Sequence, residues 1–134
     1  MSRPVAPPSG WPAPTTATLA GREIALEPLA EAVADRYFDE FPEDLSRYGV
    51  AAREWEVHDT LHCLHWAVLD VERSASLEHE VTWLANVLRS RGFPLEHLVR
   101  NLELTANVVE AQLAEAGAAV AERLRTAATG VRIG

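Results

Sequence analysis

The sequence contains no lysine and only one cysteine, and each shortage excludes a class of function. All twelve basic residues among the 134 are arginine, and the formal net charge is −8. An acidic chain without a basic block binds phosphate backbones and anionic membranes poorly, because both attract positive charge. With Cys63 alone, neither an internal disulfide nor an all-cysteine metal site can form. We therefore expect no nucleic-acid partner and no membrane partner.

Long hydrophobic runs and several catalytic motifs are missing as well. No stretch approaches the roughly 18 apolar residues that a membrane span needs. The first residues include Arg3 but no apolar run behind it, which is unlike a secretory signal, so a cytoplasmic location is expected. Glycine-rich phosphate loops, Gly-x-Ser-x-Gly and His-Glu-x-x-His are absent. The chain is therefore expected not to be an enzyme.

The composition is that of a folded domain, since 48% of the residues are hydrophobic and 24% are charged. Residues 1–22 are rich in proline and have little apolar content, which predicts a flexible arm. Residues 23–134 are predicted to form a single helical domain. No segment alternates apolar and polar residues with a period of two, so we expect no β-sheet.

Apolar residues recur with helical spacing over most of this domain. The predicted helices span about residues 28–41, 50–73, 77–91 and 94 onward. Pro28 and Pro94 suit first-turn positions, Gly92 suits the left-handed residue after a helix, and Gly117 marks a kink or a short terminal helix. Because short links join long helices, the sequence predicts an all-α fold, either a four-helix bundle or a globin-like domain.

The only concentrated chemistry is a set of histidines on the helix predicted at residues 50–73. His58, His62 and His65 are four and three residues apart, so they share one helical face, and Glu54 lies one turn before His58. With about 100° between successive residues, this face lies next to the apolar seam that is centred on Val57. Such a position predicts half-buried imidazoles that need hydrogen-bond partners, a metal or a lowered pKa.

Two interpretations of this face remain open. In the first, the histidines pack against neighbouring rings and bond to carbonyl or carboxylate oxygens, and the chain has no cofactor. In the second, His58 and His62 bind a metal ion with Glu54 as a third ligand, or one of His58, His62 and His65 holds a haem iron. A di-iron site is not expected, because the sequence has no Glu-x-x-His pair.

The remaining polar residues are expected on solvated surfaces. His79 and His97 point away from the apolar stripes of their own helices. Cys63 lacks a basic neighbour at helical spacing, and we expect it to be inert. The side of the histidine-bearing helix that is expected to face solvent carries Arg53, Glu56, Asp59 and Asp70.

Trp83 lies about 240° around its helix from Leu77 and therefore off the apolar stripe. His79 and Val87 flank it at helical spacing and make a second, partly apolar strip. Tryptophan is enriched in protein interfaces, where it often dominates the binding energy. The sequence thus predicts a homodimer or another protein partner at Trp83, His79 and Val87, unless a neighbouring segment of the same chain covers the strip.

The segment from Val81 to Val109 combines a Trp-bearing helix, an Arg-Gly-x-Pro turn and a leucine-rich helix. In this pattern it resembles the N-terminal sensor domains of bacterial stress-response co-antagonists of the RsbR type. The matching residues are Trp83, Leu84, Val87, Leu88, Arg91, Gly92, Pro94, Leu98 and Leu102. The resemblance implies a globin-like, haem-free domain that dimerises. The predicted function is a non-catalytic sensor or interaction module, and the alternative is a bundle that binds metal, haem or a small molecule through its histidines.

Overall fold

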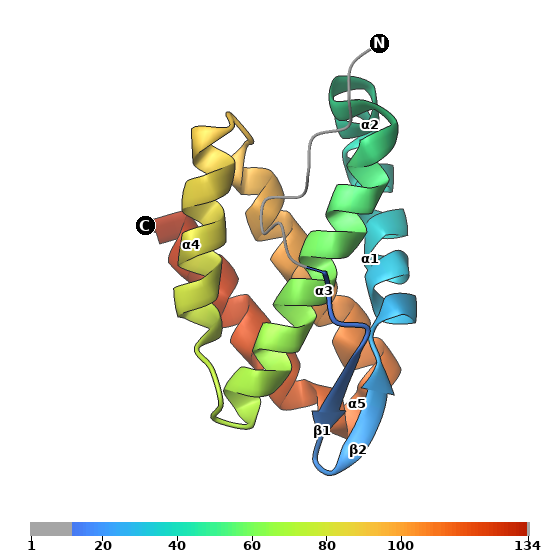
Figure 1. The fold of residues 1–134 in the computed structure, drawn as a ribbon, viewed down its shortest axis with the longest axis vertical. Coiled ribbons are helices and arrows are strands. Elements are labelled where there is room, and N and C mark those ends of the chain that lie inside the picture. The colour runs from blue at the N-terminus through green and yellow to red at the C-terminus, as the bar shows by residue number, and fades with distance from the viewer. Residues whose placement is uncertain (1–11, 134) are drawn as a thin grey trace.

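The structure, a computed structural model, describes residues 12–133. These residues form an all-α helical domain with one small β-hairpin (Figure 1). The elements are β1 (Thr16–Leu19), β2 (Arg22–Ala25), α1 (Glu27–Glu40), α2 (Pro42–Tyr48), the 3₁₀ helix η1 (Gly49–Ala51), α3 (Ala52–Val71), α4 (Leu77–Ser90) and α5 (Leu95–Ile133). The predicted helical fold class is therefore confirmed.

The helices begin and end at the residues that the sequence marks. Pro28 lies in the first turn of α1, and Pro42 begins α2 directly after α1 has ended. Ser76 caps α4, since its side-chain oxygen accepts a hydrogen bond of 3.2 Å from the backbone N–H of His79. Gly92 follows α4 with a φ of 75°, the left-handed conformation expected there.

The hydrophobic core lies between α5 and the helices α1, α3 and α4, all of which contact it (Figure 1). The apolar stripes predicted from helical spacing are buried there: Leu29, Val33 and Tyr37 of α1, Leu61, Leu64 and Val68 of α3, and Leu77, Val81, Leu84 and Leu88 of α4. Burying one such aliphatic side chain contributes about 1.5–3 kcal/mol. No helix within residues 12–133 combines the length and the apolar character that a membrane crossing requires.

The β-hairpin shows that the expectation of no sheet was wrong. β1 and β2 pair antiparallel, with Leu19 opposite Arg22. Ala20 and Gly21 form the two-residue turn with φ values of 52° and 78°, as a type I′ hairpin turn requires. Ala17 and Leu19 are buried while their neighbours in β1 are exposed, so the strand does alternate with a period of two over its four residues.

Part of the predicted flexible arm is consequently structured. The expected boundary at residue 22 falls inside the hairpin, and Leu19, only 4% exposed, belongs to the core. The backbone N–H of Ala20 donates a hydrogen bond of 2.8 Å to Glu72, which ties the turn to the end of α3. Residues 1–11 of the arm lie outside the described part of the chain.

The long helix α5 consists of two antiparallel arms. Ala114 has a φ of 48° and a ψ of −127°, and these backbone angles are not helical. The chain reverses its direction at this residue. Arg132 therefore reaches Glu103 at 3.1 Å, although their separation of 29 residues would span about 44 Å in a straight helix. The predicted break at Gly117 was misplaced. Gly117 instead allows the arms to approach, since a Cβ there would lie 2.6 Å from the carbonyl oxygen of Val109.

Candidate functional site

A cavity lies where α1, α2, α3 and the first turns of α5 meet. Its aromatic and apolar wall includes Phe38, Trp55, Phe93 and Leu98. The polar residues that line it are Tyr37, Asp44, Tyr48, Glu56, Asp59, Cys63, His97 and Asn101. The space open to the centres of water-sized molecules is about 50 Å³. One water needs roughly 10–15 Å³ of such space, so the cavity has room for about four. A hollow in which polar groups converge beside an apolar, aromatic wall is a common form of a small-molecule site.

Tyr37, Asp44 and His97 form one hydrogen-bonded group at this cavity. The Tyr37 hydroxyl donates to Oδ2 of Asp44, and Nδ1 of His97 lies 3.0 Å from the same oxygen. Asp44 is only 2% exposed, and the ring of Phe41 stacks on His97 with the centroids 3.9 Å apart. Burial, and then the hydrogen bond to Asp44, raise the pKa of Tyr37, so its hydroxyl stays protonated.

A second group joins α3 to α5. The Glu56 carboxyl group accepts hydrogen bonds from the Asn101 amide and, at 3.0 Å, from the Thr60 hydroxyl. Thr105, one turn further along α5, donates at 2.7 Å to the backbone carbonyl of Asn101. Burial raises the pKa of Glu56 to about 8, and the nearby Asp59 raises it further. The hydrogen bonds from Thr60 and Asn101 lower the pKa and offset part of this shift. Glu56 is therefore mostly protonated at neutral pH.

The other two ionisable groups on this side of α3 are Asp59 and Cys63. Burial raises the pKa of Asp59, while a contact of 3.2 Å between its Oδ1 and Nδ1 of His58 opposes the shift. Burial also raises the pKa of the Cys63 thiol, and the nearby Asp59 and Glu56 add to the effect. The cavity therefore disfavours the charged form of each carboxyl and thiol group that α3 contributes.

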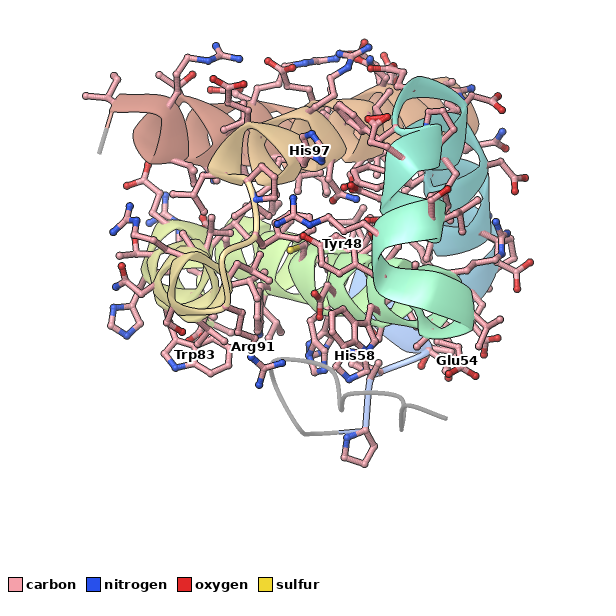
Figure 2. All side chains as sticks on the ribbon, turned by 90° about the horizontal axis from the view of Figure 1, so that it is seen from above. Tyr48, Glu54, His58, Trp83, Arg91 and His97 are labelled. Carbon is pink, nitrogen blue, oxygen red and sulfur yellow. The ribbon has the colours of Figure 1, made fainter. Side chains whose placement is uncertain are left out.

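Tyr48 contributes the least satisfied group of the cavity. Its hydroxyl oxygen is buried and has no hydrogen-bond partner among residues 12–133. Its ring lies 6.1 Å from that of Trp55 and 5.7 Å from that of Phe93, measured between centroids. In Figure 2, Tyr48 lies in the space between α3 and α5. A buried polar group left without a partner costs about 1–3 kcal/mol, so this hydroxyl offers a bound molecule an unused hydrogen bond.

The predicted histidine face lies on a different side of α3. His58, His62 and His65 are half-buried, as the helical phase indicates, and Glu54 is exposed. Figure 2 shows Glu54 and His58 on the side of the molecule away from α5. Glu54 and His58 border one surface hollow, whereas His62 and His65 border another, which also includes Trp83. The structure therefore does not gather the four candidate residues in one hollow.

These histidines contact neighbouring rings and one carboxylate, that of Asp59. The rings of His58 and His62 lie 4.7 Å apart, and His62 lies 5.4 Å from Trp66, again between centroids. Burial lowers the pKa of His65. Within residues 12–133, no group of three or more His, Cys, Asp and Glu side chains is positioned to hold a metal ion. A metal ion or haem at His58, His62 and His65 stays an untested prediction.

Three residues that we expected on solvated surfaces line the cavity instead. The side chain of His97 is 17% exposed and contacts Asp44, and Glu56 and Asp59 are half-buried. The helical phase of each residue was measured against one apolar stripe, but α3 and α5 each pack against several helices, so more than one side of each is covered. One feature of the sequence does indicate buried polar groups at this place. The leucine stripe of α5 contains two polar residues, Asn101 and Thr105, and both are buried.

The predicted interface residues lie on α4. Trp83 is 41% exposed, His79 is exposed and Val87 is half-buried. Trp83 and His79 border the same surface hollow as His62 and His65. The described part of the chain thus leaves much of the Trp83 ring open to solvent, and the predicted interface stays untested.

No family model, curated protein or solved structure matches this chain. The resemblance to RsbR-type sensor domains therefore rests on the residues between Val81 and Val109 alone. The candidate site rests on the geometry of the cavity.

Proposed function

We propose that this chain is a non-catalytic helical sensor domain that binds a small molecule in the cavity between α1, α2, α3 and α5. One observation carries the proposal: the buried hydroxyl of Tyr48 lines this cavity and has no partner among residues 12–133. A ligand that bonds to this hydroxyl removes a cost of about 1–3 kcal/mol. Room for about four water-sized groups suits a molecule with few non-hydrogen atoms.

The state of the hydroxyl and thiol groups favours binding over catalysis. Burial raises the pKa of Tyr37, Tyr48 and Cys63, so none of them is activated as a nucleophile. We propose that the response to binding passes through α2, because this seven-residue helix carries both Asp44 and Tyr48 of the cavity.

The experiment is a screen of small neutral and charged molecules by two-dimensional NMR. A ligand is expected to shift the backbone signals of Tyr48, Glu56 and Asn101 first. Ala52→Leu enlarges a buried side chain in the cavity wall and should abolish binding. Ala116→Leu, at an exposed position of α5, is the matched control and should bind as the wild type does. Failure of every molecule to bind, or undiminished binding by Ala52→Leu, would overturn the proposal.

The partner in this proposal is a second copy of the chain, and the proposed location is the cytoplasm. The observation that supports a second copy is the exposure of Trp83, which is 41% exposed on α4 next to the exposed His79. A large apolar side chain that stays open to solvent beside other partly apolar groups often marks an interface. A dimeric domain also agrees with what the resemblance to bacterial sensor domains implies.

A further inference from the structure

The cavity combines carboxyl groups with aromatic rings, and this combination indicates what it binds. We propose that the cavity binds a small organic cation, such as a primary ammonium ion, in preference to neutral molecules and anions of the same size. The inference rests on the proposed small-molecule binding and adds the chemical class of the ligand.

The charges around the cavity are the first argument. Three carboxyl groups line it, and His97 is the one basic side chain among the lining residues of the described chain. Nδ1 of His97 lies 3.0 Å from Asp44, and Asp59 contacts His58. The hydrogen bonds to Glu56, in contrast, come from the uncharged side chains of Asn101 and Thr60. A bound cation gives the Glu56 carboxylate a positive partner, whereas an anion would face three carboxyl groups.

The aromatic residues are the second argument. Tyr48 packs between Trp55 and Phe93, with ring centroids 6.1 Å and 5.7 Å away, and all three residues line the cavity. The face of an aromatic ring attracts a cation, and the attraction increases where water is excluded. The Tyr48 ring already has one such neighbour, since the guanidinium carbon of Arg47 lies 5.3 Å from its centroid. An ammonium group has only hydrogen-bond donors, and the hydroxyl oxygen of Tyr48 and the carboxyl oxygens of Glu56 are acceptors for them.

Binding of a cation should be coupled to loss of a proton from Glu56. Several groups act on this carboxyl: Tyr37 from α1, Asp44 from α2, Asp59, Thr60 and Cys63 from α3, and Asn101 from α5. Tyr48 and His97 line the same cavity. Burial holds the pKa of Glu56 at about 8, so below this pH a cation must displace one proton to solvent. The affinity for a cation should then rise about tenfold per pH unit up to pH 8 and level off above it. A neutral ligand, which has no preference for the carboxylate, should lack this slope.

The test compares ethylammonium with ethanol, which has the same number of non-hydrogen atoms. Ligands this small bind with dissociation constants of the order of millimolar at best, so NMR titration of the full chain is the suitable method. At pH 8 we expect ethylammonium to bind about tenfold more tightly than ethanol. Formate, as the anion, should not bind measurably.

Two variants and one control variant locate the effect. Glu56→Gln should lower the affinity for ethylammonium to that of ethanol for the same variant, and it should abolish the pH dependence. Glu54→Gln, on the exposed side of α3, is the matched control and should leave both affinities as in the wild type. Tyr48→Phe removes only the hydroxyl and should weaken both ligands several-fold. Circular dichroism checks that each variant is folded, and the pH series on the wild type needs no variant at all.

The outcomes separate this inference from the function on which it rests. Equal affinities for ethylammonium and ethanol would overturn the cation selectivity and leave small-molecule binding in place. An ethylammonium affinity that does not change with pH would overturn the assignment of Glu56 as the partner of the cation. If formate is the ligand that binds, the assigned charge preference is wrong. If no molecule binds at all, the proposed function itself is wrong.

Discussion

Asp44 and His97 are 53 residues apart in the sequence, yet Oδ2 of Asp44 lies 3.0 Å from Nδ1 of His97. The Tyr37 hydroxyl donates to the same oxygen. These three residues come from α2, α5 and α1, so one buried carboxyl oxygen links three helices at the edge of the cavity. Both the stability of the domain and the shape of the cavity depend on this contact.

Replacing Asp44 should therefore be costly. Asp44→Ala leaves the Tyr37 hydroxyl and the His97 ring without their shared acceptor, and we expect it to lower the free energy of unfolding by about 2–4 kcal/mol. Tyr37→Phe removes a single hydrogen bond and should cost about 1 kcal/mol. Urea denaturation of both variants and of the double variant measures the coupling. Adding Tyr37→Phe to Asp44→Ala should cost little more, and strictly additive losses would contradict the linkage.

The stability of the domain should fall as the pH rises through neutrality. Because the pKa of Glu56 is about 8 in the folded chain, against an ordinary value of 4.5, the folded state holds a proton that the unfolded state has lost between these values. The stabilisation is complete below the unfolded pKa, is lost as the pH rises towards about 8, and changes no further above it. The raised pKa of Asp59 acts with the same sign.

Urea denaturation at a series of pH values measures this slope. Glu56→Gln should make the slope shallower, since glutamine keeps the shape of the side chain and has no proton to lose, and the contribution of Asp59 should remain. Glu54→Gln should keep the wild-type slope, because Glu54 is exposed. The lowered pKa of His65 acts with the opposite sign, so the difference between the wild type and Glu56→Gln is the quantity to compare. A slope between about pH 5 and pH 8 that Glu56→Gln leaves unchanged would show that Glu56 is not held protonated in the folded chain.

The helices could be predicted because the residues of a helix that face the core are apolar and recur every three or four positions. Leu77, Val81, Leu84 and Leu88 recur every three or four residues, and all four are buried. The hairpin could not be predicted from periodicity, for a physical reason. Each of its strands has four residues, so the alternation along β1 is too short to stand out, and its turn is Ala-Gly where Asn-Gly or Asp-Gly is the strong signal.

The cavity could not be predicted in this way, because its residues come from separate helices and from the second covered side of α3. Measured against the Leu61–Leu64–Val68 seam, Glu56 and Asp59 fall on what looks like an outer face. Thr60, Cys63 and Ala67, which lie near that face, are all buried. Small, weakly polar residues at helical spacing beside two acids are therefore the indication in the sequence that this side of α3 is covered too.

The reversal of α5 makes a stabilising substitution available. Ala114 has a φ of 48° and a ψ of −127°, a conformation that glycine adopts easily and other residues rarely do. Its side chain is exposed, so Ala114→Gly loses no packing and should raise the free energy of unfolding by about 1 kcal/mol. Ala111→Gly, at an exposed helical position of the first arm, should lower it by about 0.5–1 kcal/mol. Thermal and urea denaturation distinguish the two, and a loss of stability in both would contradict the reversal at Ala114.

Trp83→Arg tests whether the chain forms a dimer through α4. Trp83 is 41% exposed, and the buried stripe of α4 already meets the core without it. A tryptophan at the centre of an interface contributes a large part of the binding energy, and an arginine in its place would bury an unpaired charge against the second copy. We therefore expect wild-type protein to sediment as a dimer. The variant should sediment with half that mass and keep its helical circular dichroism spectrum.

Val50→Arg is the matched control for this experiment. Val50 is also a large apolar residue on the surface, 94% exposed, but it lies in η1, and the hollow that contains Trp83 does not include it. If the interface is at Trp83, Val50→Arg remains a dimer. Dissociation by both variants would indicate a general effect of surface charge. If the wild type is a monomer at high concentration, no dimer forms on α4, and the sensor proposal then stands on the cavity alone. Unfolding of Trp83→Arg would mean instead that the tryptophan supports the fold of its own chain.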